Sequence, residues 1–337
     1  MITQDTDFTA ALQHAIDTKT KPVGSLGRME GLAARIARIQ ATLKPTAETC
    51  QLTIFAADHG MATAGVSSYP QDVTRQMVAN FLSGGAAANV FARSLGADIR
   101  IVDSGVAGDA IAHPNLVSRR IAPGTANALE GPAMTEAQVE AAITTGRALG
   151  AEKTHAVACF GEMGIGNTSA SSLVAAKLLG LPVEDITGRG TGLDDAGLAR
   201  KRALLSTAAT RTAARLDART ALMEYGGFEI AMMAGAMMGA AEAGRIVIVD
   251  GFIASVAALC ARDLMPAAAG AFIYAHRSAE AGHARVLEAL DAEPLLDLGM
   301  RLGEGTGALL AWPLVKSAAA MLREMASFDS AGVSGPA

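Results

Sequence analysis

The sequence predicts an α/β protein with a doubly wound, mainly parallel sheet, and three features support this. Short apolar runs are typical of buried strands at 52–57, 99–103, 154–160, 246–249 and 272–274. Stretches with helical character separate these runs, as connections between parallel strands require. Acids and glycines follow several of the strands. Because ligands bind at the carboxyl edge of such sheets, one active edge is expected.

Length and composition favour a protein that acts on a small molecule. The chain has 337 residues, enough for one large domain or for a large and a small one. Its 28 basic and 33 acidic residues give a net charge of −5, which argues against a nucleic-acid partner or an anionic membrane surface. No uncharged apolar stretch approaches the ~20 residues that span a bilayer. Three widely spaced cysteines fit buried thiols in a reducing cytoplasm.

The first 50 residues are expected to form helices, because apolar residues recur there at helical spacing in two runs. A glycine-rich link at 21–28 joins the runs; it fits a hinge and helix cap as well as a segment that faces an anion. A long helical stretch at 72–95 is interrupted by Gly84 and Gly85. The segment 105–131 has little periodicity and is expected to be a long excursion.

Further helices are expected at 135–149, 229–243 and 308–325. The helix at 229–243 is rich in methionine and alanine, which is more typical of a protein core than of a cofactor site. An extended piece at 295–298 precedes the last helix. Helices therefore alternate with strands along most of the chain, as the doubly wound architecture requires.

A glycine-rich turn at 161–166 follows the strand 154–160 and precedes a helix expected at 169–179, with Asn167 or Thr168 as its cap. Such a turn can direct backbone amides at a phosphate. Asn167 stands where a P-loop has its lysine, so nucleoside triphosphate chemistry is disfavoured.

A second glycine cluster at 188–195 is followed by a cationic helix that carries Lys201. A lysine that reaches back across a glycine loop is a common phosphate ligand. Surface helices often carry such charges as well, so both interpretations stay open.

Two glutamates, Glu162 and Glu304, each lie between glycines and are expected to be exposed in loops for acid–base chemistry. The alternative is that each carboxylate only binds nearby loop amides. No metal or other cofactor is expected, because the six histidines form no H-x-x-x-H pair, and no G-x-S-x-G motif indicates a nucleophile. Anion-binding loops beside paired carboxylates favour transfer of a phosphorylated sugar through a cationic transition state.

Several blocks of the sequence together resemble one family, the nicotinate-nucleotide–dimethylbenzimidazole phosphoribosyltransferases, which activate the lower base of cobalamin. They run in family order over most of the chain. The blocks are KPVGSLGRME (21–30), ADHG (57–60), GVSSYPQDVTRQMVANF (65–81), GEMGIGNT (161–168), GRGTGLDD (188–195), DGFI (250–253), HRSAE (276–280) and PLLDLGMRLGEGTG (294–307).

This resemblance implies a reaction between two small molecules. Nicotinate mononucleotide is the donor and 5,6-dimethylbenzimidazole the acceptor, and the products are α-ribazole 5′-phosphate and nicotinate. Glu304 is implied to be the general base, with attack from the face opposite the leaving group and inversion at ribose C1. Glu162 is implied to steady the oxocarbenium ion or to assist the base.

The resemblance also implies binding residues and an assembly. The family is homodimeric, with a Rossmann-like large domain, here 51–304, and a small helical domain from both chain ends, here 1–50 plus 305–337. Lys201, with the backbone of two glycine loops, is implied to hold the phosphate, and three residues to line the acceptor pocket. The loop residues are Gly164, Ile165, Gly166, Asn167, Arg189, Gly190, Thr191 and Gly192, and the acceptor residues are Ser68, Tyr69 and Gln76.

Three alternatives remain at this point. The acceptor could be another base, because related heterocycles fit similar pockets. An enzyme that uses phosphoribosyl pyrophosphate is disfavoured, since the strand 246–249 leads to a single acid, Asp250, and not to two adjacent acids. A non-catalytic nucleotide-binding protein could carry the same glycine loops.

Overall fold

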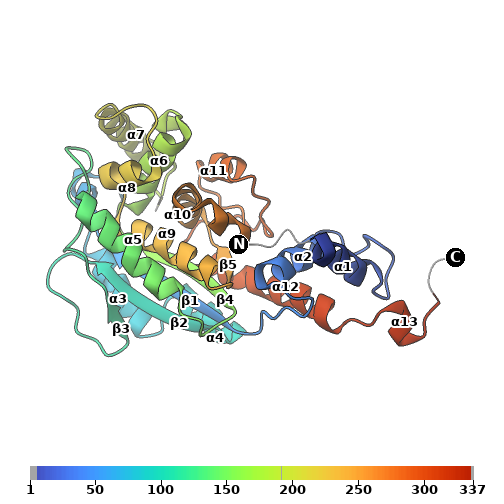
Figure 1. Cartoon of the computed structure of the whole chain (residues 1–337). Helices are drawn as coiled ribbons and strands as arrows, with labels where there is room; N and C mark the ends of the chain where they lie inside the picture. Colours follow the sequence, from blue (N-terminus) through green and yellow to red (C-terminus); the bar gives the residue numbers. More distant parts are fainter. Residues whose placement is uncertain (1–5, 191, 335–337) are drawn as a thin grey trace.

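The computed structural model of the chain describes residues 6–190 and 192–334. Six parallel strands form one sheet in the order β3-β2-β1-β4-β5-β6, with helices on both faces (Figure 1), so the expected doubly wound α/β class is confirmed. The strands are β1 (Cys50–Ala57), β2 (Asp98–Gly105), β3 (Leu116–Ser118), β4 (Val157–Met163), β5 (Ile246–Val249) and β6 (Phe272–Tyr274).

The strand order reverses between β1 and β4. β1 pairs with β2 on one side and with β4 on the other, from Cys50↔Val157 to Ala56↔Met163. Connections leave this central pair in opposite directions, which opens a crevice beyond the carboxyl ends of the strands. The site described below lies at this edge.

Each strand contributes side chains to two apolar cores, because its side chains alternate between the two faces of the sheet. Leu52 and Ile54 of β1 belong to one core, and Phe55 and Ala57 belong to the other. The first core is covered by α1 (Thr6–Asp17), α2 (Arg28–Gln40), α3 (Val73–Leu82), α4 (Ala87–Leu95) and α12 (Thr306–Glu324). The second is covered by α5 (Glu136–Gly150), α6 (Asn167–Leu179), α7 (Asp195–Ala209), α8 (Ala218–Tyr225), α9 (Phe228–Glu242), α10 (Phe252–Leu264) and α11 (His283–Ala289).

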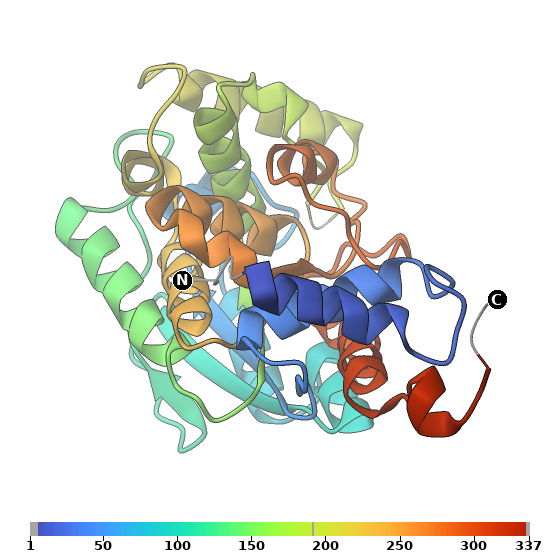
Figure 2. The same ribbon diagram turned by 45° about the vertical axis from the view of Figure 1, so that its right-hand side comes forward.

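Helices from both chain ends pack together at one end of the sheet (Figures 1 and 2), where α13 (Phe328–Ala331) also lies. The indole Nε1 of Trp312 in α12 donates a hydrogen bond to the carbonyl of Ala47 at 2.7 Å. A backbone bridge also joins Lys19 to Ser327. This packing is compatible with a small domain built from both ends, but the division at 50 and 305 stays a proposal.

Besides small extensions of β1 and β2, the observed strands differ from the expected ones in three places. β4 begins at Val157 and continues to Met163, so Gly161 and Glu162 lie in a strand and not in a loop. The short edge strand β3 lies inside the segment 105–131, where three residues are too few to show a period. The piece at 295–298 contributes only a single bridge, between Leu296 and His276.

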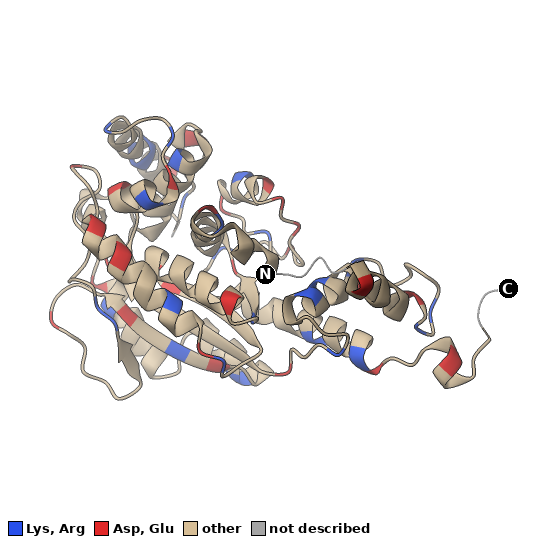
Figure 3. Cartoon of the chain, viewed as in Figure 1, with Lys and Arg blue, Asp and Glu red and all other residues tan. Residues whose placement is uncertain are grey.

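Charged residues of both signs are interspersed over the view in Figure 3. Across 6–190 and 192–334, no helix is long and apolar enough to cross a membrane.

Helices α5 and α9 pack backbone against backbone through four glycines. A Cβ added at Gly146 would lie 1.9 Å from the carbonyl oxygen of Met232, and one at Gly235 would lie 2.1 Å from that of Ile143. Gly150 and Gly239 show the same close approach. Since real Cβ atoms do not approach a carbonyl this closely, any side chain here must push the helices apart.

We therefore expect Gly235→Ala to lower the free energy of unfolding by about 1–3 kcal/mol, the usual cost of overpacking a core. Urea denaturation followed by circular dichroism measures this change. Gly31→Ala is the matched control, because Gly31 is exposed in α2 and an added Cβ meets nothing within 4 Å. It should raise stability by about 0.5–1 kcal/mol through helix propensity. Equal effects of the two substitutions would contradict the packing argument.

Candidate active site

A cavity of about 600 Å³ opens at the carboxyl edge of the sheet. Glu162 and Met163 at the end of β4, Asp250 after β5 and His276 after β6 form its floor. Its wall comes from α3, from the turn before α6 and from the loop before α12. The cavity therefore lies beside the reversal of strand order, where doubly wound folds bind ligands.

Glu162 is 7% exposed and faces the cavity from the carboxyl end of strand β4. Its neighbour Gly161 is required by packing, because an added Cβ there would lie 2.4 Å from the carbonyl carbon of Glu304. The expectation that flanking glycines expose the carboxylates is thus wrong. The glycine instead lets the peptide of one glutamate rest on the strand that carries the other.

The protonation of Glu162 is set by its surroundings. Burial, together with the charges of Asp250, Glu229 and Glu304, raises the pKa of Glu162 to about 8. The Nδ2 group of Asn167 donates a hydrogen bond to its Oε2. Before a ligand binds at neutral pH, Glu162 is therefore mostly protonated, and a cationic ligand would favour its ionised form.

Glu304 lies in a loop with unusual backbone conformation. Gly303, Glu304 and Gly305 have φ values of 85°, 61° and 79°, all in the left-handed region. For a glutamate this conformation costs on the order of 1–3 kcal/mol, and such strain is concentrated at functional sites. The side chain is 6% exposed, and its Oε2 has no hydrogen-bond partner among the residues that the structure describes. Burial raises the pKa of Glu304, the Ala88 backbone amide opposes this, and Asp250 adds to it.

Backbone amides in and next to the turn at 164–166, which the sequence suggested could bind a phosphate, already make hydrogen bonds within the protein. Helix α6 begins at Asn167, and its N-cap is Gly166 with φ 99°, so neither Asn167 nor Thr168 is the cap. The amide of Ile165 donates to Thr74 Oγ1 at 3.0 Å, and that of Asn167 donates to the Gly164 carbonyl at 3.1 Å. These two amides are therefore already bonded within the protein. Gly164, Ile165 and Asn167 line the cavity.

A buried ion pair supports this turn from below. His59 Nε2 lies 2.7 Å from Glu229 Oε1, and both side chains are fully buried. Burial opposes the charge of His59, but Glu229 and Asp58 together raise the pKa of the imidazole. An added Cβ at Gly166 would lie 3.2 Å from the Cβ of His59, so the turn rests directly on this pair.

Lys201 lies directly behind the cavity wall. Its side chain is fully buried, and Nζ donates to Thr168 Oγ1 at 3.1 Å and to the Gly188 carbonyl at 3.2 Å. Thr168 and Gly190 separate it from the cavity that they line. Burial lowers the pKa of Lys201 to about 8, against the opposing charge of Glu280.

Arg301 lies on the same wall of the cavity. Its guanidinium donates to the Gly190 carbonyl at 3.1 Å. The loop before α12 is therefore tied to the second glycine cluster across the cavity rim.

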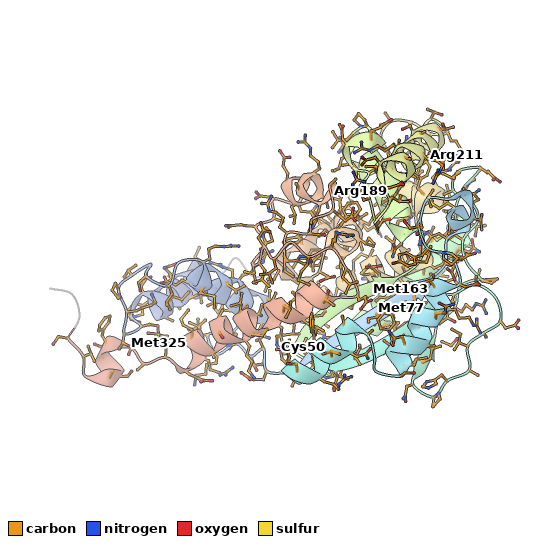
Figure 4. The ribbon with its side chains drawn as sticks, turned by 180° about the vertical axis from the view of Figure 1, so that it is seen from behind. Cys50, Met77, Met163, Arg189, Arg211 and Met325 are labelled. Carbon is orange, nitrogen blue, oxygen red and sulfur yellow. The ribbon has the colours of Figure 1, made fainter. Side chains whose placement is uncertain are left out.

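The remaining expected residues are distributed unevenly. Tyr69 lines the cavity and is half exposed, and Met77 and Met163, which Figure 4 labels, line it as well. The residues that do not line it are Ser68, Gln76, Gly166, Arg189 and Gly192. Of these, Arg189 bonds the Leu193 carbonyl and Asp195 instead. Thr191 lies outside the described residues.

Sequence reasoning missed several residues that line the cavity. Asp250 follows β5 directly and His276 follows β6 after one residue, so their positions at strand ends were a usable signal. Ser278, Glu280 and Arg301 lie in irregular segments, where only the fold brings them to the cavity. The blocks of family resemblance contain all five, but no pattern distinguished the last three from their neighbours.

The chain is similar to known proteins over almost its whole length. A family model described as Phosphoribosyltransferase matches residues 2–333. The nicotinate-nucleotide–dimethylbenzimidazole phosphoribosyltransferase of Dechloromonas aromatica (strain RCB) is 55% identical over 336 residues, covering 98% of this chain and 97% of that protein. The protein of the same name from Aromatoleum aromaticum (strain DSM 19018 / LMG 30748 / EbN1) is 53% identical, with coverage of 98% and 96%.

The fold of the chain also matches that of a solved structure. The crystal structure of CobT from Thermus thermophilus superposes with a TM-score of 0.94 at 42% identity, over 98% of this chain and 100% of that one. Fold, cavity and family match define an enzyme of the phosphoribosyltransferase class. Within it, the chain belongs to the nicotinate-nucleotide–dimethylbenzimidazole phosphoribosyltransferase family. The alternative of a non-catalytic nucleotide-binding protein is not retained.

The raised pKa of Glu162 predicts how stability depends on pH. The folded protein binds a proton at this carboxyl between about pH 4.5 and 8, whereas the unfolded chain does not, so the Glu162 contribution falls as pH rises through this window. Glu162→Gln should remove this loss. We expect its unfolding free energy relative to wild type to improve by a few kcal/mol, on the order of 1.4 kcal/mol per pKa unit, from pH 5 to pH 8.

Urea denaturation at both pH values measures this difference. Glu136→Gln, at an exposed position in the first turn of α5, is the control and should follow the wild-type trend. If Glu162→Gln also follows that trend, the carboxyl titrates normally and the electrostatic account is wrong.

Proposed function

We propose that this enzyme transfers the 5-phosphoribosyl group of nicotinate mononucleotide to 5,6-dimethylbenzimidazole, releasing nicotinate and forming α-ribazole 5′-phosphate. The names of the full-length relatives support these substrates. The observation that carries the proposal is the meeting of two buried carboxyls, Glu162 and Glu304, in one cavity, with Glu304 Oε2 unpartnered among the described residues. The product would serve in assembling the lower ligand of cobalamin.

Glu304 is proposed as the general base. As one ring nitrogen of the acceptor forms a bond to ribose C1, the other becomes acidic, and its proton passes to Glu304. The raised pKa of Glu304, caused first by burial, makes this carboxylate a better proton acceptor than an exposed glutamate. Tyr69, Val73 and Met77 supply an apolar wall that suits a benzimidazole ring.

The leaving group needs little assistance. The ring nitrogen of nicotinate mononucleotide is cationic, so breaking its bond to C1 neutralises that ring and moves positive charge onto the ribose. Glu162, ionised by the cationic donor, would stabilise this oxocarbenium ion from its buried position in the cavity. Attack from the opposite face would convert the β linkage to the α linkage.

The phosphate is proposed to lie at the Gly190 side of the cavity. Arg301 faces the cavity there, and Lys201 lies behind Thr168 and Gly190. Lys201 would thus act through the charge it places beneath the wall and through Thr168, whose hydroxyl it bonds. Of the expected loop residues, those that line the cavity remain part of the proposed phosphate site: Gly164, Ile165, Asn167 and Gly190.

Glu304→Gln tests the base assignment. We expect kcat to fall by about 10²–10⁴-fold, the usual contribution of general base catalysis, while nicotinate mononucleotide still binds. Product formation is measured by chromatography, and donor binding by calorimetry. Glu288→Gln, an exposed glutamate on α11, should behave as wild type. Turnover by Glu304→Gln at the wild-type rate would refute the assignment.

The substrates and stereochemistry are tested together by incubating wild-type enzyme with nicotinate mononucleotide and a panel of bases. We expect 5,6-dimethylbenzimidazole to give the α-ribotide, identified by nuclear magnetic resonance, and EDTA to leave the rate unchanged. A β-configured product would refute inversion. Failure to form any ribotide would refute the function, and a preference for another base would reassign the acceptor.

Assembly and location are proposed on separate grounds. Cys50, Cys159 and Cys260 are buried and free, which fits a reducing cytoplasm. A homodimer follows from the family resemblance, and light scattering of the purified protein would measure its mass.

A further inference from the structure

Asp250 connects the end of β5 to the loop that carries Glu304. Its Oδ2 accepts a hydrogen bond from the backbone amide of Gly305 at 3.2 Å, and its Oδ1 accepts one from the amide of Ala308 at 2.8 Å. Gly305 is the N-cap of α12, and Ala308 lies in the first turn of that helix. One carboxylate therefore binds the residue immediately after Glu304 and the helix that follows it.

The surroundings of Asp250 leave it little freedom. It is 3% exposed, and its Oδ1 lies 3.8 Å from Nε2 of the equally buried His276. A Cβ added at Gly307 would lie 2.8 Å from Oδ1 and 2.1 Å from Cδ2 of His276, so this glycine lets the helix sit directly on the pair. Burial raises the pKa of Asp250, whereas His276 and the backbone amides of the helix start oppose this rise and favour the ionised form.

The position of Asp250 also bears on the charge state of the cavity. It lines the cavity together with Glu162 and Glu304, and its negative charge raises the pKa of both glutamates, after burial as the larger cause. Glu304 itself occupies a left-handed conformation that surrounding structure must hold in place. Asp250 constrains this conformation, because it binds the amide of Gly305, the residue after Glu304.

We propose that Asp250 is a positioning residue for the transfer reaction, which fixes the orientation of Glu304 through the hydrogen bonds that it accepts from the Gly305 and Ala308 amides. This inference rests on the proposed function, because it assigns to Glu304 the role of base. Asp250 would act on the reaction through Glu304 and not by touching the proton that is transferred.

The groups that face Glu304 come from several elements. Glu162 in β4 and Asp250 after β5 are acidic, and His276 after β6 is next to Asp250. The Ala88 amide at the start of α4 opposes the rise in the Glu304 pKa. Arg301 lies three residues earlier in the same loop and is bonded to a backbone carbonyl across the cavity. Of these, only Asp250 both bonds the Glu304 loop by its side chain and raises the Glu304 pKa.

Two substitutions separate the charge of Asp250 from its geometry. Asp250→Asn removes the charge and leaves one oxygen to accept an amide. We expect kcat/KM at neutral pH to fall about tenfold to a hundredfold, as for small misplacements of a catalytic group, and its acidic limb to move down by about one pH unit. Asp250→Glu keeps the charge but moves the carboxylate oxygens. We therefore expect kcat to fall while the acidic limb of the pH profile stays near its wild-type position.

Asp103→Asn is the matched control. Asp103 is buried at the end of β2, accepts the amides of Gly105 at 3.0 Å and Val106 at 2.9 Å, and does not line the cavity. It therefore reproduces the structural role of Asp250 without contact to the Glu304 loop. Asp103→Asn should lower the unfolding free energy and leave the pH profile of kcat/KM unchanged.

The outcomes distinguish this inference from the function on which it rests. Wild-type enzyme without transferase activity, or Glu304→Gln with full activity, would refute the proposed function or its base. An inactive Glu304→Gln together with an unmoved acidic limb in Asp250→Asn would refute only the role of Asp250. If Asp250→Asn fails to fold, wild-type turnover by Asp250→Glu would overturn the positioning role, and reduced kcat with an unmoved limb would support it.

Discussion

The contact between the Glu304 peptide and Gly161 determines the arrangement of the site. An added Cβ at Gly161 would lie 2.4 Å from the Glu304 carbonyl carbon, so only a glycine in β4 lets the two segments touch. These segments lie far apart in the sequence. Their contact brings one carboxyl from the middle of the sheet next to one from the start of the last long helix, and buries both.

Burial has opposite consequences for the acids and for the basic groups of this enzyme. It raises the pKa of Glu162 to about 8, so that this carboxyl stays mostly protonated near neutral pH, and it lowers the pKa of Lys201 to about 8. In the free protein, such buried groups lack the hydration that they would have in water, which has a free-energy cost. The proposed donor, with its cationic ring and anionic phosphate, would offset this cost at both groups, and such preorganised charges favour charge development in a transition state.

Much of the fold could be predicted from local patterns. The apolar runs of β1, β2, β5 and β6 predicted those strands because parallel strands covered on both faces must be apolar throughout. The end of β4 was misplaced because glycine and glutamate normally terminate strands. Here the ladder with β1 continues, and tertiary packing on Gly161 overrides local preference. Both glutamates predicted from the sequence, Glu162 and Glu304, line the cavity. The hydrogen bonds that Asp250 accepts from Gly305 and Ala308 join distant segments, and no local pattern encodes them.

Helix α12 connects the cavity with the packed ends of the chain. It begins after Gly305, next to the strained glutamate, and its 19 residues extend about 28 Å, by the rise of an α-helix, to the packed chain ends. Its first turn is bonded to Asp250, and residues along its length are buried in the same core as α2 and α4. One continuous helix therefore joins the two ends of the chain to the loop of Glu304.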